Sequence, residues 1–207
     1  MAESKEKTNL LRRARERFLR IGIRSVSMDD IARELGISKK TLYQLVENKE
    51  DLVHQVLEQD TCDDLATMQR NLHESADAID EFLRNSRYFI RQMREVSPTA
   101  MHDLRKYYPD LFHNQVKTHQ HAFRKGVAAN LERGMEEGLY RDDIDAEVIA
   151  NLYVGMTMMV IDRGVFPAQD RPLSEIMRQH STYHFNGIVN QFGRERLENY
   201  LKQEDLS

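Results

Sequence analysis

The stretch GISKKTLYQLVENKEDL, residues 36–52, joins a turn-forming residue to a short helical pattern rich in basic groups. Gly36 tolerates the left-handed backbone that follows many helices, and Ser38 is well suited to cap the next one. Leu42 and Leu45 then supply an apolar side for a helix that starts at this cap. The stretch therefore predicts a tight turn and a short helix whose N-terminal end carries two lysines.

A second short helix is predicted just before this turn. Ser27 precedes the eight residues MDDIAREL, and Asp30 stands at the third helical position, which is a variant of the capping box. Ile31, Ala32 and Leu35 make the apolar face of this helix, and the small Ala32 allows a close crossing. Two short helices joined by a glycine turn are typical of a helix-turn-helix, whose second helix enters the DNA major groove by its N-terminal end.

The polar side chains that this frame leaves facing outward are candidate DNA contacts. They are Ser27, Lys39, Lys40, Thr41, Tyr43, Gln44 and Lys49. Lysines release counterions from phosphates, a glutamine reads an adenine edge directly or through water, and a tyrosine hydroxyl reaches a phosphate oxygen. Taken singly, each lysine could equally be an ordinary solvated residue, and Tyr43 could be partly buried in a small core. Their combination on one helix-turn-helix favours DNA binding.

The charge distribution agrees with a DNA-binding domain, here called the head, in the first fifty residues. The chain has 207 residues and a formal net charge of -4, yet residues 1–50 contain 12 basic and 8 acidic side chains. The remainder is correspondingly acidic, so one end alone is suited to a polyanion. A chance asymmetry between two solvated surfaces is the alternative explanation.

Composition also indicates the compartment. The single cysteine, Cys62, excludes an internal disulfide and fits a reducing cytosol. The N-terminal residues are charged and lack the apolar core of a signal peptide. The longest apolar stretch, LYVGMTMMVI, is shorter than the roughly 20 residues that span a bilayer. We therefore expect a cytoplasmic protein without a membrane partner.

The rest of the chain also shows helical periodicity, and no convincing alternating strand pattern occurs. About nine helices are expected, which predicts an all-α fold. The first helix ends at Gly22, Asn48 caps a long one, and Pro109 precedes another. Composition shifts near residue 50, which predicts a helix-turn-helix domain over 1–50 and a larger helical domain over 51–207.

Residues 14–57, ARERFLRIGIRSVSMDDIARELGISKKTLYQLVENKEDLVHQVL, resemble the N-terminal domain of the TetR family of bacterial transcription regulators. The resemblance covers about a quarter of the chain and rests on many positions at fixed spacing: Ala14, Phe18, Gly22, Ser27, Asp30, Ile31, Ala32, Gly36, Ser38, Thr41, Leu42, Tyr43 and Asn48 to Leu52. The family usually has a histidine or tyrosine and then a phenylalanine where this chain has Leu45 and Val46. That change bears on one phosphate contact, whereas Val46 can still serve as a core residue.

The resemblance implies a head of three helices, a homodimer joined mainly by the last two long helices, and a ligand cavity in each C-terminal domain. The sequence supports the dimer independently, because the helices expected over 147–164 and 173–192 are apolar on more than one side. Gly155 and Gly187 would let them approach a partner closely. The predicted interface consists of Met159, Val160, Ile176, Met177, His180, His184, Gly187 and Ile188. Burial of both helices inside a monomer core is the alternative.

An adaptable apolar pocket is expected in the C-terminal domain, since methionine side chains accommodate varied shapes. Its candidate lining is Phe89, Met93, Tyr107, Phe112, Phe123, Tyr153 and Met156. Ordinary core packing is the alternative interpretation. A small, mostly apolar ligand would favour one spacing of two heads over another, and the long helix that begins at Lys49 would transmit the change.

Other chemistry finds little support in the sequence. His180 and His184 are four residues apart, a spacing that can hold zinc, but no carboxylate or cysteine completes a ligand pattern. No paired nucleophile and base or phosphate-binding loop is recognisable, so we expect no metal, no cofactor and no enzymatic activity.

The leading hypothesis is a ligand-responsive repressor that binds a near-palindromic operator in double-stranded DNA as a homodimer and is released by a small apolar effector. The resemblance places such a protein in the bacterial cytoplasm, associated with the nucleoid. One alternative is a helical small-molecule-binding or scaffold protein without DNA binding. Another is an enzyme that uses the helical cavity.

Overall fold

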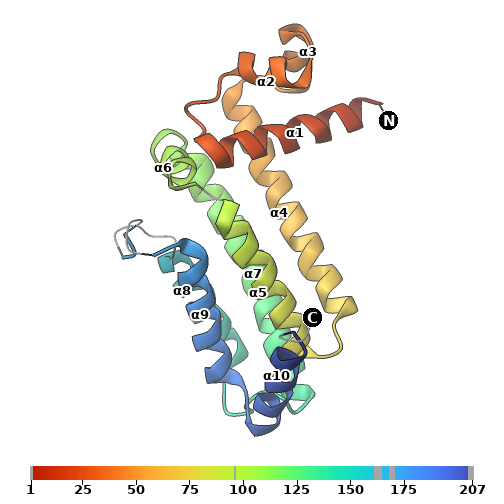
Figure 1. Ribbon diagram of the computed structural model, residues 1–207, viewed down its shortest axis with the longest axis vertical. Helices are drawn as coiled ribbons and strands as arrows, with labels where there is room; N and C mark the ends of the chain where they lie inside the picture. The colour runs from red at the N-terminus through yellow and green to blue at the C-terminus, as the bar shows by residue number, and fades with distance from the viewer. Residues whose placement is uncertain (1, 96, 161–164, 168–170, 205–207) are drawn as a thin grey trace. The chain divides into compact units, whose positions relative to one another are not determined.

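The computed structural model describes residues 2–95, 97–160, 165–167 and 171–204. These residues form ten helices and a single isolated β-bridge, so the expected all-α fold is confirmed with one helix more than expected (Figure 1). The helices are α1 (Ala2–Ile21), α2 (Met28–Leu35), α3 (Lys39–Leu45), α4 (Lys49–Glu74), α5 (Ala78–Glu95), α6 (Pro98–Tyr107), α7 (Pro109–Glu136), α8 (Ala146–Val160), α9 (Leu173–Ile188) and α10 (Gln191–Glu204). Within the described residues, no helix is both long enough and apolar enough to cross a membrane.

The chain folds into two compact units. Unit 1 contains Met1–Asp64 and Glu95–His119, and unit 2 contains Leu65–Arg94 and Gln120–Ser207. Because the boundaries fall inside α4 and α7, each of these long helices runs from one unit into the other. Unit 1 thus includes more than the first fifty residues, and the expected division at residue 50 stays a prediction about function.

Unit 1 is built on α1, which packs against α2 and α6. Ala14 and Phe18 of α1 are buried in the core, whereas Ile21 at the end of this helix is exposed. Gly22 ends α1 with a φ of 88°, and a Cβ at this position would lie 2.7 Å from Thr99 Cγ2 of α6. The glycine therefore supplies both the positive φ and the close approach of the loop to α6.

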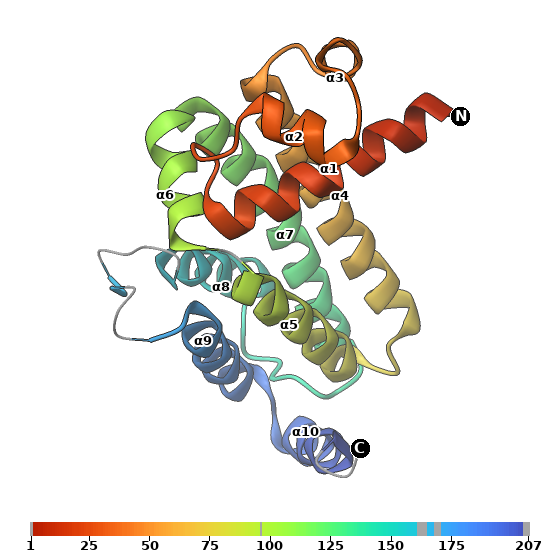
Figure 2. The same ribbon diagram turned by 45° about the horizontal axis from the view of Figure 1, so that its top comes forward.

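Unit 2 has an aromatic core. Phe82 of α5, Phe123 of α7, Tyr153 of α8 and Phe185 of α9 are buried in one cluster. The ring centroids of Phe82 and Phe185 lie 4.8 Å apart, and those of Phe82 and Tyr153 lie 5.9 Å apart. α8 and α9 pack directly against each other, as both views show (Figures 1 and 2). Since four helices each contribute a ring, this cluster holds the unit together.

Buried polar groups near the start of α5 are paired. The Tyr140 hydroxyl donates to the carbonyl of Ala78 at 3.0 Å and to Oδ1 of Asn130 at 3.1 Å. The Asp77 carboxylate accepts from the guanidinium of Arg196 of α10 at 2.8 Å. These bonds satisfy groups that would otherwise be costly to bury.

The C-terminal helical segment is broken where the sequence predicted continuity. α9 ends at Ile188 rather than at Phe192, because Val189 adopts an extended backbone and bridges to Tyr140. The expected end of the preceding helix at Gly164 lies outside the described residues, and α8 is described as far as Val160.

Asn190 holds this break in place. Its side-chain amide donates to the carbonyls of Gly138 and Tyr140 at 2.9 and 3.1 Å, and its Oδ1 accepts from the N–H of Gly193 at 2.9 Å. A Cβ on Gly193 would lie 2.1 Å from the Leu139 carbonyl oxygen, so the start of α10 needs glycine there. These contacts join segments far apart in the sequence, which is why local periodicity missed the break.

Candidate functional site

The helix-turn-helix is formed by α2 and α3, and α3 lies at the outer edge of unit 1 in both views (Figures 1 and 2). Ser27 caps α2, because its Oγ accepts from the Asp30 N–H at 3.1 Å and its own N–H donates to the Asp30 carboxylate at 3.0 Å. The Ser27 hydroxyl also donates to this carboxylate, and these bonds lower the pKa of Asp30. Gly36 adopts a φ of 66°, and the N–H of Ile37 bonds to the Ala32 carbonyl at 3.0 Å.

α3 begins immediately after this turn. Ser38 Oγ accepts from the Thr41 N–H at 3.1 Å and lies 2.9 Å from the Thr41 hydroxyl, which confirms Ser38 as the cap. Leu42 is fully buried, Val46 is buried as expected, and the half-buried Leu45 packs against the same core. The apolar side of α3 therefore faces unit 1, and Leu45 takes part in that packing.

The opposite side of α3 is open to solvent. Lys40 and Gln44 are exposed, and within the described residues neither side chain has a hydrogen bond or an ion pair. Tyr43 is 50% exposed, so it is not buried in the core. Positions i, i+3 and i+4 share one helix face, and the three side chains therefore present a cation, a phenol and an amide together.

Three other predicted DNA contacts have partners inside unit 1. The ammonium of Lys39 lies 2.7 Å from the Asp29 carboxylate, and the hydrogen bond between them raises the pKa of Lys39. The ammonium of Lys49 donates to the Arg24 carbonyl at 3.4 Å, and burial lowers the pKa of Lys49. The Ser27 hydroxyl is occupied by its own capping box. These three side chains are thus less available to DNA than Lys40, Tyr43 and Gln44, which form the open face of α3.

Arg24, in the loop between α1 and α2, is a basic residue of the head that the sequence analysis missed. Its guanidinium donates to the Tyr107 hydroxyl at 2.7 Å and lies 5.1 Å from the centroid of that ring. Its backbone N–H donates to the Asp103 carboxylate at 2.8 Å. Tyr107, predicted in the ligand cavity, is instead an exposed residue of unit 1. One face of its ring packs against the Arg24 guanidinium.

Residues 10–56 match the family model for bacterial regulatory proteins of the tetR family. The match extends from α1 into α4 and so contains the whole helix-turn-helix with its two capping serines and its glycine turn. Over these residues the chain therefore matches the TetR family of bacterial regulatory proteins. Regulators of this family are not enzymes, which supports the expectation drawn from the sequence motifs. No curated protein matches the chain.

Solved structures share the fold of this protein over nearly its whole length. A TetR-family regulator from Agrobacterium tumefaciens is similar at a TM-score of 0.71 and 17% identity, over 91% of this chain and 100% of the other. A transcriptional regulator from Cytophaga hutchinsonii gives 0.72 and 18%, over 88% and 98%. A TetR-family regulator from Streptomyces coelicolor gives 0.66 and 22%, over 90% and 97%. At such identities the likeness shows the fold.

Unit 2 contains a small aromatic cavity. Its volume is about 20 Å³, room for about one water molecule. The lining consists of Met68, Phe82, Asn85, Ser86, Phe89, Phe123, Gly126, Val127, Asn130 and Tyr153. Three of the predicted pocket residues, Phe89, Phe123 and Tyr153, are thus brought together.

The other predicted pocket residues lie elsewhere. Phe112 packs against the core of unit 1, and Tyr107 also belongs to that unit. Met93 packs against a separate cluster in unit 2 around Val160. Met156 is half-buried and is not part of the cavity lining. The structure places these four outside the cavity lining, because the periodicity of a helix gives its buried side without saying which cluster that side joins.

The predicted dimer interface is mostly buried within one subunit. The side chains that pack inside this unit are Val160, Ile176, Met177, His180, His184 and Ile188, and their contact with a partner stays a prediction. Met159 and Gly187 are exposed. The exposed side of α8 is nevertheless apolar, with Val148, Leu152 and Met159 each more than half exposed and nothing within 4 Å of a Cβ placed on Gly155. These four positions follow one another at spacings of four, three and four residues.

His180 and His184 of α9 lie against the rings that line the cavity. The His180 ring centroid is 4.6 Å from that of Tyr153, and the His184 centroid is 4.2 Å from Tyr153 and 5.5 Å from Phe82. Both ring nitrogens of His180 and Nε2 of His184 are buried, and they have no hydrogen-bond partner among the described residues. Burial lowers the pKa of both imidazoles, that of His184 to about 4. No three metal-ligating side chains come together in the described part of the chain.

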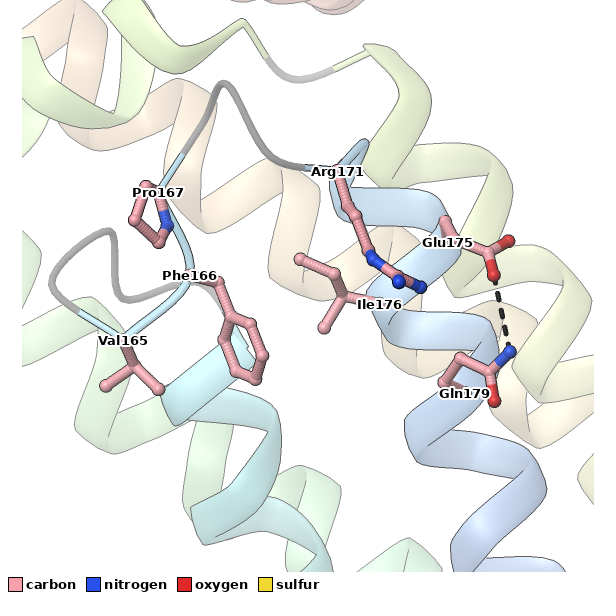
Figure 3. A pocket seen from close by; sticks show the side chains of 7 residues that line it. All are labelled: Val165, Phe166, Pro167, Arg171, Glu175, Ile176 and Gln179. Atoms are coloured by element: carbon pink, nitrogen blue, oxygen red, sulfur yellow. Dashed lines mark hydrogen bonds between the residues drawn. The ribbon is translucent and has the colours of Figure 1, made fainter.

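A second hollow, missed from the sequence, lies at the surface near the start of α9 (Figure 3). It has a volume of about 310 Å³ and is lined by Val165, Phe166, Pro167, Arg171, Glu175, Ile176 and Gln179. Gln179 donates to Glu175 at 3.3 Å, and the Arg171 side chain extends beside Ile176 (Figure 3). This pocket therefore combines an apolar wall with an exposed cation.

Proposed function

We propose that the protein is a ligand-responsive repressor that binds a near-palindromic DNA operator as a homodimer and is released by a small, mostly apolar effector. The observation that carries the proposal is the open face of α3, where Lys40, Tyr43 and Gln44 project to solvent from a well-capped helix-turn-helix. Polar groups held on a rigid frame without internal partners are what a groove-reading helix requires.

The open face assigns different roles to its side chains. Lys40 and Tyr43 contact phosphates and so add affinity for any duplex, whereas Gln44 contacts a base edge and so adds sequence preference. Thr41, half-buried and bonded to Ser38, contacts the backbone at the edge of the groove. Lys39, Lys49 and Ser27 contribute less, because each already has a partner in unit 1.

The homodimer is proposed to form through the exposed side of α8 together with that of α9. On α8 this side consists of Val148, Leu152, Gly155 and Met159, and on α9 it includes Tyr183 and Gly187. Apolar side chains at this spacing form a stripe along a helix, and glycines allow a neighbouring backbone to approach. Two copies paired in this way would present two α3 helices to half-sites about 34 Å apart.

The effector is proposed to bind in the aromatic cavity of unit 2. α4 supplies Met68 to this cavity and begins in unit 1 at Lys49, so one continuous helix links the cavity to the head. α7 has the same property, with Phe123 at the cavity. A ligand changes DNA binding through these helices only if it has different affinities for two arrangements of the dimer.

Selection of bound duplexes from a random pool tests the DNA-binding part. The expected outcome is a motif with two-fold symmetry and half-sites about one helical turn apart, bound less tightly as salt rises. Recovery of no motif, together with no salt-dependent binding to any duplex, would favour a helical small-molecule-binding or scaffold protein.

Sedimentation of Leu152→Glu tests the interface. A charge in the middle of the stripe should raise the dimer dissociation constant by about a hundred-fold or more, since it leaves an unpaired carboxylate in an apolar contact. Leu201→Glu on α10 is the matched control, because Leu201 is also exposed but lies off the stripe. Equal effects of the two variants would refute the assignment of the α8 face.

A further inference from the structure

The buried histidine pair is the least satisfied polar feature of unit 2. His184 is 6% exposed and His180 is 9% exposed, and three of their four ring nitrogens have no hydrogen-bond partner in the described residues. Buried side-chain polar atoms normally have a partner, so each such group needs an explanation. A ligand that supplies the missing partners is one.

The surroundings of the pair are aromatic and uncharged. Tyr153 stacks on His180 and packs at a tilt of 40° against His184, and Phe82 stacks on His184. The Tyr153 hydroxyl lies 3.5 Å from Ser181 Oγ and is the titratable group that faces the pair from α8. No carboxylate or cation among the described residues forms an ion pair with either histidine. The imidazoles are therefore neutral, and each offers one donor and one acceptor.

The donor and the acceptor that each imidazole offers indicate which class of ligand would fit. A carboxylic acid brings one acidic donor and one acceptor, and its hydrogen bond to an imidazole gains strength as the proton moves toward the nitrogen. An amide or alcohol also fits the geometry but cannot transfer a proton to a base of this strength. Two imidazoles without a third ligand do not make a metal site.

We propose that His180 and His184 receive the carboxyl group of a small monocarboxylic acid, and that the apolar body of this acid lies in the adjoining aromatic cavity. Tyr153 and Phe82 belong both to the cavity wall and to the stack on the histidines, so the two subsites are contiguous. The claim that the acid acts as an effector rests on the function proposed above. The claim that these residues bind the acid does not depend on that function.

Entry of such an acid requires side chains to move, because the cavity holds only about 20 Å³. Met68 is suited to this movement, since it is unbranched and half-buried, and its Cε would lie 2.5 Å from a Cβ on residue 126. Displacement of Met68 opens the cavity on the side of Gly126. Rotation of the Tyr153 ring then joins the cavity to the histidines.

Binding must also balance charge. At neutral pH the acid is a carboxylate in solution and both histidines are neutral, so transfer of the carboxylate alone would bury an uncompensated charge. The complex therefore takes up one proton from solvent, which resides on an imidazole nitrogen or on the carboxyl oxygen. Uptake of one proton makes the affinity rise about ten-fold for each unit by which the pH falls between roughly 8 and 6.5.

The test uses phenylacetate and octanoate as probes, each with its primary amide as the neutral counterpart. Full-length protein with isotope-labelled histidine is titrated with each probe at millimolar concentration, and the imidazole signals of His180 and His184 are followed by NMR. The expected result is a shift of both signals with at least one acid and a much smaller shift with its amide. Calorimetry in two buffers of different ionisation enthalpy should report uptake of about one proton.

Variants identify the site. His180→Leu and His184→Leu should each weaken acid binding by more than ten-fold, whereas His121→Leu, an exposed histidine of α7, should leave it unchanged. Arg171→Gln tests the surface pocket, whose cation is a rival partner for a carboxylate. Loss of binding in Arg171→Gln with retention in the α9 variants would overturn the proposal.

The direct NMR signals keep the test valid even if a variant folds poorly. Absence of any shift with both acids, or equal shifts with acid and amide, also overturns the proposal. Failure of the proposed function looks different: acids would bind as expected but leave the affinity for the selected duplex unchanged. Duplex binding that persists without any acid binding would reject the ligand class and leave the DNA-binding role intact.

Discussion

Two sets of polar side chains in this protein lack partners within the described residues, and they differ in burial. On α3, Lys40 and Gln44 are exposed to water; on α9, His180 and His184 lie in the core of unit 2. Water satisfies the first set without cost, whereas each buried unpaired group costs on the order of 1–3 kcal/mol. The exposed side chains therefore indicate a function only because they lie on a helix-turn-helix. The buried histidines need an explanation even without such a context, because their burial is unfavourable.

Other buried polar groups of unit 2 show that the histidines are exceptional. Asp77 has Arg196 and Tyr200 as donors, and the Tyr140 hydroxyl bonds to Ala78 and Asn130. The core of this unit thus pairs its polar groups where it can. A cost concentrated at one pair of side chains marks a place where a ligand or a proton has a large effect.

The largest expected effect is on stability against acid. The unfolded imidazole of His184 binds a proton below about pH 6.5, whereas burial keeps the folded one neutral until about pH 4. The unfolded state therefore binds more protons in this window, and the free energy of unfolding should fall by about 3 kcal/mol as the pH falls through it. Urea titrations at several pH values measure this loss, which His184→Leu should abolish.

In unit 1, Asp60 changes the free energy of unfolding in the opposite direction over a similar pH range. Burial of Asp60 raises its pKa to about 6 despite the ion pair with Arg15 at 2.5 Å, so the folded state retains that proton longer than the unfolded state. Asp60 therefore makes the free energy of unfolding fall as the pH rises from 3.8 to about 6. Because this contribution is the same in wild type and His184→Leu, the difference between their pH profiles isolates the histidine. Identical profiles would contradict the assignment.

Local signals in the sequence predicted the exposed polar side chains of α3. They did not predict that His180 and His184 would be buried with unpaired ring nitrogens. The capping serines, Gly36 and the apolar positions of α3 act within a few residues, so the frame and its open face could be read directly. The burial of His180 and His184 depends on rings from α5 and α8, and the same helical periodicity fits a dimer surface equally well. The break before α10 was missed for the same reason, since distant backbone contacts impose it.

The second prediction concerns sequence preference at the exposed set. Gln44→Ala should weaken binding to the selected operator by about ten-fold or more while binding to random duplex changes little, because a glutamine on a base edge contributes about 1–3 kcal/mol of discrimination. Competition of labelled operator against both kinds of duplex measures the ratio. An equal loss on both would show that Gln44 contacts the backbone instead.

The third prediction concerns the free cation of the open face. Lys40→Ala should weaken binding to every duplex by about five-fold per subunit, the effect of about 1 kcal/mol that one exposed charge contact contributes. The slope of log affinity against log salt should also fall by about one per subunit. Fluorescence anisotropy at several salt concentrations gives both quantities. An unchanged slope would remove Lys40 from the phosphate contacts.

The smallest effect is expected at Lys39, which differs from its neighbour Lys40 in having a partner. Its ammonium already lies 2.7 Å from the Asp29 carboxylate, so a phosphate must compete with an existing ion pair. Lys39→Ala should therefore change affinity and salt slope less than Lys40→Ala does. Asp29→Asn should do the reverse and strengthen binding to all duplexes about two-fold to five-fold, because it frees the lysine and removes an anion beside the proposed DNA contacts. If Lys39→Ala and Lys40→Ala weaken binding equally and Asp29→Asn does not strengthen it, the ion pair does not persist at the DNA surface, and pairing inside unit 1 does not decide which lysine binds.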